Sequence, residues 1–203
     1  MERCRMVFSG SGGQGVITAA IILAEAAVLH ENLLAIQSQA YGPEARGGAA
    51  RSDVIISDAP IHFPKVTQPN VLVCLTQQAY NKFYAIIRPG GLLITDTRHV
   101  KTERKADARQ RELPLQDTVM AKIGNPLTLN ICMLGAVISL TDIVRPESVL
   151  KVLADRVPPE FREINRQALQ LGMELGLGSE KHPRERSRIA PENGPEAETP
   201  VAG

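Results

Sequence analysis

Residues 8–20 read FSGSGGQGVITAA, and this stretch decides the fold of the chain. It places four glycines within the six residues from Gly10 to Gly15, and apolar residues at helical spacing follow at once. Residues 3–8, RCRMVF, precede it and are predicted to form a strand. Glycine has no Cβ, and the first N–H groups of a helix have no partner within the helix. A strand, a glycine turn and a helix start therefore predict a backbone that can approach an anion closely.

The elements around this stretch alternate between strands and helices. Helix 14–30 and strand 33–38 complete a unit of strand, helix and strand, which we expect to cross over right-handed. Further strands are predicted at 49–57, 70–75, 92–96 and within 98–114, and further helices at 76–87, 116–124, 127–140, 146–157 and 158–176. The compact apolar run at 70–75 is typical of a central strand. The pattern predicts an α/β fold: an open, mostly parallel, Rossmann-like sheet flanked by helices, with an antiparallel insertion at 49–57 and a helical C-terminal part.

Length and composition predict one globular domain over residues 1–178 and a disordered tail over 179–203. The tail holds four prolines and mixed charges, with almost no large apolar residue. The net charge of +1 and the 3% aromatic content argue against a nucleic-acid partner. No apolar run reaches the length of about 18 residues that a membrane span needs, so we expect a cytoplasmic protein without a membrane partner.

The cysteines and histidines do not form a ligand pattern. Cys4, Cys74 and Cys132 lie in separate apolar runs without a CxxC pair, which is typical of reduced core cysteines. The four histidines are scattered along the chain. The sequence therefore predicts no metal site, no iron–sulfur cluster and no catalytic residue on this chain.

The glycine turn matches GxGxxG, but its surroundings do not match a nucleotide-binding motif. NAD binding requires an acid at the end of the second strand, where residues 36–39 read IQSQ, and Glu31 comes before that strand. Val16 stands where a P-loop needs lysine. Two interpretations stay open: the turn binds a phosphate-bearing group, or its glycines serve only close packing. The candidate binding residues are Gly10, Ser11, Gly12, Gly13, Gln14 and Gly15.

A second motif, YGPEARGG at 41–48, follows the second predicted strand. Ligands of open α/β sheets bind at the carboxyl ends of the strands, so this loop can form a second wall of the same site. Its candidate binding residues are Tyr41, Glu44 and Arg46. The alternative is a local ion pair between Glu44 and Arg46, worth less than about 1 kcal/mol.

Taken together, five segments resemble the gamma subunit of 2-oxoacid:ferredoxin oxidoreductases. They are GSGGQGVITAA (10–20), YGPEARGGAARSDVIIS (41–57), LVCLTQQAYNKF (72–83), IGNPLTLNICMLGAV (123–137) and FREINRQALQLG (161–172). The resemblance covers roughly residues 3–176. The second motif, with Ser57, Asp58 and Ile61 after it, looks most like the 2-oxoglutarate branch. The pyruvate and 2-oxoisovalerate branches, and a free-standing nucleotide-binding protein, stay open as alternatives.

The resemblance implies that the chain supports chemistry carried out on other subunits. Members of the family decarboxylate a 2-oxoacid on thiamine diphosphate, transfer the acyl group to coenzyme A and reduce ferredoxin. It implies that thiamine diphosphate and Mg²⁺ lie between alpha and beta subunits, and that [4Fe-4S] clusters lie on beta or a separate ferredoxin-like delta subunit. This chain would then hold no cofactor alone but would face coenzyme A, whose phosphates suit the N–H groups of residues 12–15. Gln14 and Arg46 would assist. A purely structural interface domain is the competing interpretation.

Two further features raise questions. Asn130 interrupts the apolar helix 127–140, and its amide needs partners in a neighbouring loop or across a subunit interface. The basic stretch 98–111 either adds charge to the site or forms a solvated face, and the solvated face is favoured.

Overall fold

The computed structural model describes residues 3–40, 49–103 and 106–178. Its strands are β1 (Cys4–Ser11), β2 (Leu34–Ala40), β3 (Ala49–Ser57), β4 (Val71–Cys74), β5 (Gly91–Asp96) and β6 (Ala108–Leu113). Its α-helices are α1 (Val16–His30), α2 (Gln77–Phe83), α3 (Leu115–Lys122), α4 (Leu129–Thr141), α5 (Pro146–Arg156) and α6 (Pro159–Gly178), with short 3₁₀ helices η1 (Tyr84–Ile86) and η2 (Pro126–Thr128). The predicted tail, 179–203, lies outside the described residues.

The six strands form one mixed sheet in the order β2-β3-β1-β4-β5-β6. β1, β4, β5 and β6 pair in parallel, and β3 is antiparallel to both of its neighbours. The predicted α/β class, the antiparallel insertion at 49–57 and the central place of the strand at 70–75 are confirmed. The helical C-terminal part is confirmed as well.

The first strand–helix–strand unit differs from the prediction in one respect. β2 runs in the same direction as β1, but β3 lies between them and pairs with both. The chain turns back after β2 and inserts β3 as an antiparallel strand, which a short connection permits. Hydrophobic periodicity identifies a strand but carries no information on its neighbours. The prediction therefore had the right elements and the antiparallel direction of β3, but it did not place β3 between β1 and β2.

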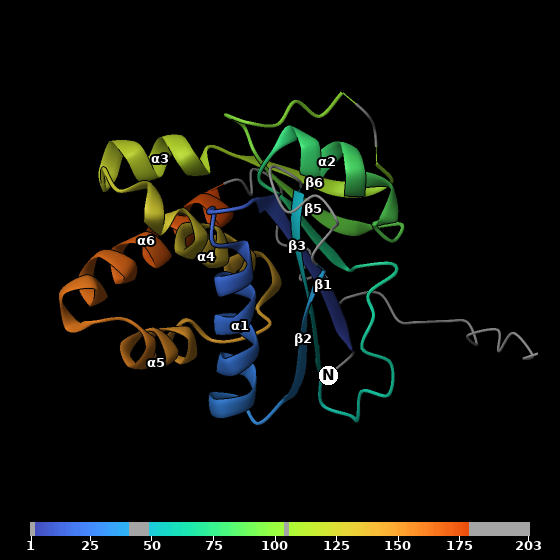
Figure 1. Cartoon of the computed structure of the whole chain (residues 1–203), viewed down its shortest axis with the longest axis horizontal. Coiled ribbons are helices and arrows are strands. Elements are labelled where there is room, and N and C mark those ends of the chain that lie inside the picture. The colour runs from blue at the N-terminus through green and yellow to red at the C-terminus, as the bar shows by residue number, and fades with distance from the viewer. Residues whose placement is uncertain (1–2, 41–48, 104–105, 179–203) are drawn as a thin grey trace, which may run out of the picture.

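Helices cover the two faces of the sheet unequally (Figure 1). α1, α4, α5 and α6 lie on one face, and α2 lies on the other. In β1, the side chain of Phe8 belongs to the large core under α1 and α4, whereas that of Val7 belongs to the smaller core under α2. Burial of one such apolar side chain contributes about 1.5–3 kcal/mol. Strands covered on both faces need apolar residues at every position, which explains the unbroken VLVC of β4.

Local signals in the sequence explain where the helices begin and end. Thr76 caps α2, because its hydroxyl accepts a hydrogen bond from the N–H of Ala79 at 3.2 Å. The Asn125 side chain caps η2, which precedes α4 as a tighter first turn. Gly124 has φ +74° and follows α3, where a left-handed residue ends the helix at low cost. The predicted helix 76–87 is a shorter α2 followed by η1.

α4 and α6 pack with their backbones in contact. A Cβ at Gly172 would overlap the carbonyl oxygen of Cys132, and a Cβ at Gly135 would overlap that of Leu169. Only glycine permits this approach, so the two helices form one rigid layer beside α1. None of the helices among the described residues is long and apolar enough to cross a membrane.

Candidate ligand-binding site

The glycine turn lies at the carboxyl end of β1, in the middle of the sheet. β1 extends through Gly10 and Ser11, so the turn proper is shorter than the sequence suggested. Gly13 and Gly15 have φ values of +91° and +68°, which favour glycine over any other residue. Gly15 is the N-cap of α1, and the helix starts at Val16. The turn therefore depends on glycine for its backbone path as well as for space.

Gln14 closes the turn onto itself. Its Oε1 accepts a hydrogen bond from the N–H of Ser11 at 2.8 Å, and its own N–H donates to the carbonyl of Ser11 at 3.3 Å. A Cβ at Gly10 would lie 2.5 Å from the same Oε1, so this side-chain position requires glycine there. The Oε1 atom of Gln14 is thus bonded within the turn, and its Nε2 has no hydrogen-bond acceptor among the described residues.

The outer part of the turn is not covered by any described residue. Among the described residues, no heavy atom lies within 4 Å of the position that a Cβ would take on Gly12 or on Gly13. Among the described residues, the N–H groups of Gly12, Gly13, Gly15 and Val16 have no hydrogen-bond acceptor. α1 also has no side-chain cap and no acid in its first turn. Unpaired donors at the positive end of a helix can bind an anionic group.

The second motif lies outside the described residues, so the structure does not test its three candidates, Tyr41, Glu44 and Arg46. The residues on either side of it are described. β2 ends at Ala40, and β3 begins at Ala49, which pairs with Ser11 of the glycine turn. The end of β2 and the start of β3 therefore lie at the same end of the sheet as the glycine turn.

The sequence left open whether the amide of Asn130 bonds a neighbouring loop or lies at a subunit interface. Asn130 lies in the first turn of α4, and its side chain packs against Gly15. Its hydrogen bond among the described residues is with the N–H of the adjacent Ile131. A Cβ on residue 15 would lie 2.6 Å from the Nδ2 atom of Asn130. Sequence reasoning identified the unusual amide but not its neighbour, which comes from a segment more than a hundred residues earlier.

The thiols are not placed for chemistry. Cys4, Cys74 and Cys132 are free and fully buried, and burial raises the pKa of each to about 12. Buried thiols of this kind are unreactive, as the sequence predicted for core cysteines. In the part of the chain that the structure describes, no group of three His, Cys, Asp or Glu side chains could hold a metal ion.

The basic stretch 98–111 contacts neighbouring helices of the same domain. Arg98 forms an ion pair with Asp117 at 2.5 Å, in which both side chains are about half exposed. The backbone N–H of Lys101 donates to Gln77 of α2 at 2.7 Å. The described part of this stretch thus has the features of a solvated face that is anchored to the fold.

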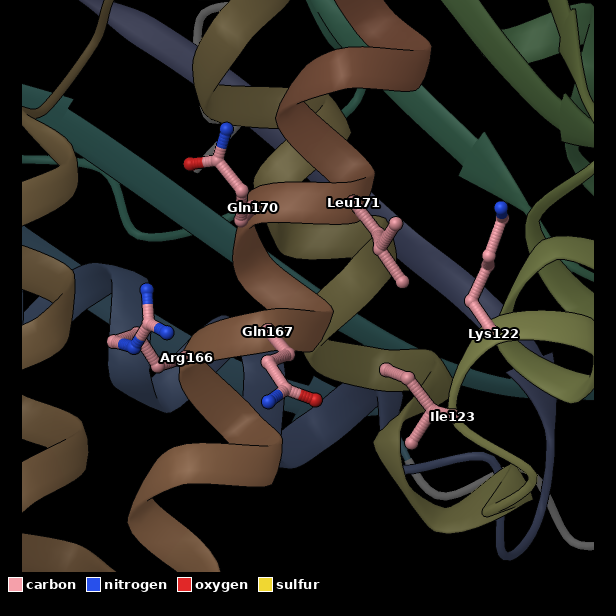
Figure 2. Close-up of a pocket in the computed structure, with 6 residues that line it drawn as sticks. All are labelled: Lys122, Ile123, Arg166, Gln167, Gln170 and Leu171. Atoms are coloured by element: carbon pink, nitrogen blue, oxygen red, sulfur yellow. The ribbon is translucent and has the colours of Figure 1, made fainter.

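A groove of about 220 Å³ lies between the end of α3 and the middle of α6. Figure 2 shows its lining: Lys122, Ile123, Arg166, Gln167, Gln170 and Leu171. None of the candidate residues lines it. The guanidinium of Arg166 is paired with Glu163 at 2.7 Å, so this charge is already neutralised. The groove is separate from the glycine turn and provides no reactive group.

Fold and site together define a class: an α/β domain with a mixed six-stranded sheet and a glycine turn at the carboxyl end of β1, in which no group of three His, Cys, Asp or Glu side chains among the described residues could hold a metal ion. The family model of pyruvate ferredoxin/flavodoxin oxidoreductase matches residues 5–175, and the chain belongs to this family. Within the family it is a gamma-type subunit of a 2-oxoacid:ferredoxin oxidoreductase. The resemblance noted in the sequence is thereby confirmed.

Three relatives show how far the similarity extends. The 2-oxoglutarate synthase subunit KorC of Methanocaldococcus jannaschii is 46% identical over 169 residues, which cover 82% of this chain and 90% of the relative. The crystal structure of the gamma subunit of a Geobacter sulfurreducens keto/oxoacid ferredoxin oxidoreductase matches with a TM-score of 0.82 and 40% identity, over 88% of this chain and 99% of that one. A 2-oxoglutarate:ferredoxin oxidoreductase of Magnetococcus marinus, solved with 2-oxoglutarate, coenzyme A and succinyl-CoA, shares the fold at a TM-score of 0.79 and 20% identity, over 88% of this chain and 32% of that one.

Proposed function

We propose that this chain is the gamma subunit of a 2-oxoglutarate:ferredoxin oxidoreductase. Such an enzyme decarboxylates 2-oxoglutarate, transfers the succinyl group to coenzyme A and passes two electrons to ferredoxin. The observation that carries the proposal is the 46% identity with a KorC subunit over nearly the full length of both chains. The motif at 41–48 supports the same branch, with pyruvate and 2-oxoisovalerate as the alternative substrates.

The remaining parts of the enzyme belong to its other subunits. We expect alpha and beta subunits to hold thiamine diphosphate and Mg²⁺, and beta or a ferredoxin-like delta subunit to hold [4Fe-4S] clusters. Thiamine diphosphate would supply the decarboxylation chemistry when bound there. We place the complex in the cytoplasm, in keeping with three cysteines that are all free thiols.

We further propose that the glycine turn binds the phosphates of coenzyme A. The support comes from the described residues of this chain: among them, the N–H groups of Gly12 and Gly13 have no acceptor and no atom covers either glycine, and the positive end of α1 lies behind them. The Nε2 of Gln14 can donate a further hydrogen bond. The proposed role of this domain is to bind and orient the acyl acceptor, while the bond changes take place on partner subunits.

Purification from the native cell tests the subunit assignment. The tagged chain should recover thiamine-binding and cluster-bearing subunits, identified by mass. The complex should reduce a viologen acceptor with 2-oxoglutarate at a kcat/KM at least about tenfold above that with pyruvate or 2-oxoisovalerate. Faster turnover of either alternative substrate would assign the chain to that branch. Recovery of the chain alone with a bound nucleotide would contradict the subunit assignment.

Gly12→Val tests the coenzyme A site. Gly12 lacks a positive φ and has free space at its Cβ position, so the substitution leaves the fold intact but places a branched side chain over the turn. We expect the KM for coenzyme A to rise at least about tenfold, equivalent to about 1.4 kcal/mol. Reduction of the complex by 2-oxoglutarate without coenzyme A should stay at the native rate.

Gly178→Val is the matched control, because Gly178 is equally open and lies at the far end of α6. It should leave the KM for coenzyme A at the native value. An unchanged KM in the Gly12 variant would favour a purely structural role for the glycine turn.

A further inference from the structure

The contact between Asn130 and Gly15 joins the starts of two helices. Gly15 caps α1 with a left-handed backbone, and Asn130 lies in the first turn of α4. A Cβ on residue 15 would lie 2.6 Å from Nδ2, 2.9 Å from Cγ and 3.0 Å from Cβ of Asn130. The side chain of Asn130 therefore fills the space that any larger residue at position 15 would need.

The carboxamide of Asn130 is held in one orientation. Its Oδ1 accepts a hydrogen bond from the N–H of Ile131 at 2.9 Å, which turns Nδ2 toward the glycine turn. Among the described residues, Nδ2 has no hydrogen-bond acceptor. The side chain thus contacts the turn through van der Waals packing, and its geometry is fixed from the α4 side.

The support behind Asn130 is rigid. α4 packs against α6 with glycine at the contacts, and the backbones leave no room for a Cβ at Gly135 or Gly172. The body of α4 is buried, including every residue from Ile131 to Ile138. A displacement of Asn130 would have to move this whole layer, because close-packed cores deform little.

We infer that Asn130 is a positioning residue for the glycine turn: it supports the left-handed backbone of Gly15 and holds the N–H groups of Gly12, Gly13, Gly15 and Val16 in their ligand-facing arrangement. The inference deepens the proposed function and rests on it for the identity of the ligand. The positioning itself is a property of the free chain and can be measured without coenzyme A.

Two variants separate packing from charge. Asn130→Ala removes the carboxamide that contacts Gly15. Asn130→Asp keeps its shape and its acceptor oxygen but places a negative charge beside the start of α1, where it would repel a phosphate. Asn165→Ala is the matched control, because Asn165 is a half-buried amide on α6 whose Nδ2, among the described residues, donates to the carbonyl of Phe161 at 2.8 Å.

Amide hydrogen exchange of the full-length chain measures positioning, with peptides covering residues 9–17 and, as an internal reference, residues 19–27 of α1. For Asn130→Ala we expect exchange of the hydrogen-bonded amides of Ser11 and Gln14, resolved within 9–17, to rise at least about tenfold while 19–27 stays within about twofold. Asn130→Asp and Asn165→Ala should both leave 9–17 within about twofold of native. Unchanged exchange at 9–17 in Asn130→Ala, or a uniform rise over both peptides, would overturn the inference.

Kinetics of the assembled complex then separate this inference from the proposed function. If both hold, Asn130→Ala and Asn130→Asp each raise the KM for coenzyme A at least about fivefold and leave reduction by 2-oxoglutarate without coenzyme A at the native rate. A rise in exchange at 9–17 with an unchanged KM in both variants would retain the positioning role and reject coenzyme A as the ligand of the turn.

Discussion

Glu31, an acid that the sequence could not assign to a ligand, joins two helices at the end of α1. Its carboxylate accepts hydrogen bonds from the Ser148 hydroxyl at 2.5 Å, from the Arg145 backbone N–H at 3.0 Å and from the Arg145 Nε at 3.0 Å. Arg145 is the N-cap residue of α5. The carboxylate thus binds at a helix N-terminus, where its charge is favourable. Glu31 therefore links α5 to α1. This structural contact explains why an acid stands before β2, away from the end of β2 where a dinucleotide-binding fold has its ribose-binding acid.

This carboxylate should make stability depend on pH. Burial raises the pKa of Glu31, but the hydrogen bonds from Ser148 and Arg145 outweigh it and lower the pKa from 4.5 to about 2. A pKa lower in the folded than in the unfolded state adds stability that is complete above pH 4.5 and is lost as the pH falls toward 2. Glu31→Gln should therefore cost about 1 kcal/mol at pH 7 and progressively less below pH 4.5, as measured by urea unfolding.

Asp155→Asn on the exposed side of α5 serves as the comparison. It should show a smaller loss at pH 7 than Glu31→Gln. An equal loss at pH 7 and pH 3 in the Glu31 variant would show that packing, and not the charge, accounts for the contribution.

At the scale of elements, the contact between α4 and α6 depends on the absence of side chains. Alanine normally stabilises a helix interior by about 1 kcal/mol relative to glycine. At Gly172 the added Cβ would overlap the carbonyl oxygen of Cys132, so the helices must separate. Gly172→Ala should lower the free energy of unfolding by about 1–3 kcal/mol, against its helix propensity.

Gly178→Ala, on the same helix but with open space at its Cβ, should be neutral or stabilising by up to about 1 kcal/mol. Both values follow from urea unfolding of the full-length chain. A stabilising Gly172→Ala would contradict the close packing of α4 and α6.

At the scale of the whole molecule, the topology brings three distant segments to the carboxyl end of β1. The glycine turn follows β1, the end of β2 at Ala40 and the start of β3 at Ala49 lie at the same end of the sheet, and the first turn of α4 contacts the turn through Asn130. Helices α1, α4, α5 and α6 form the layer behind this edge (Figure 1). In the function proposed above, this end of the sheet is the surface that binds coenzyme A and contributes to a site formed with the partner subunits.

The sequence by itself determined the elements, the α/β class, the buried cysteines and the glycine turn. These depend on signals within a few residues: apolar periodicity, the caps at Thr76 and Asn125, and glycines at positive φ. The motifs were also sufficient for the family, because their combination spans most of the chain.

Only the tertiary structure decided which segments meet. The insertion of β3 between β1 and β2, the packing of Asn130 on Gly15, and the contact of Glu31 with Arg145, 114 residues later in the chain, all join distant segments. A local pattern states which face of an element is buried but not what buries it. That choice follows from the simultaneous packing of all the elements, in which each close contact depends on the shapes of the others.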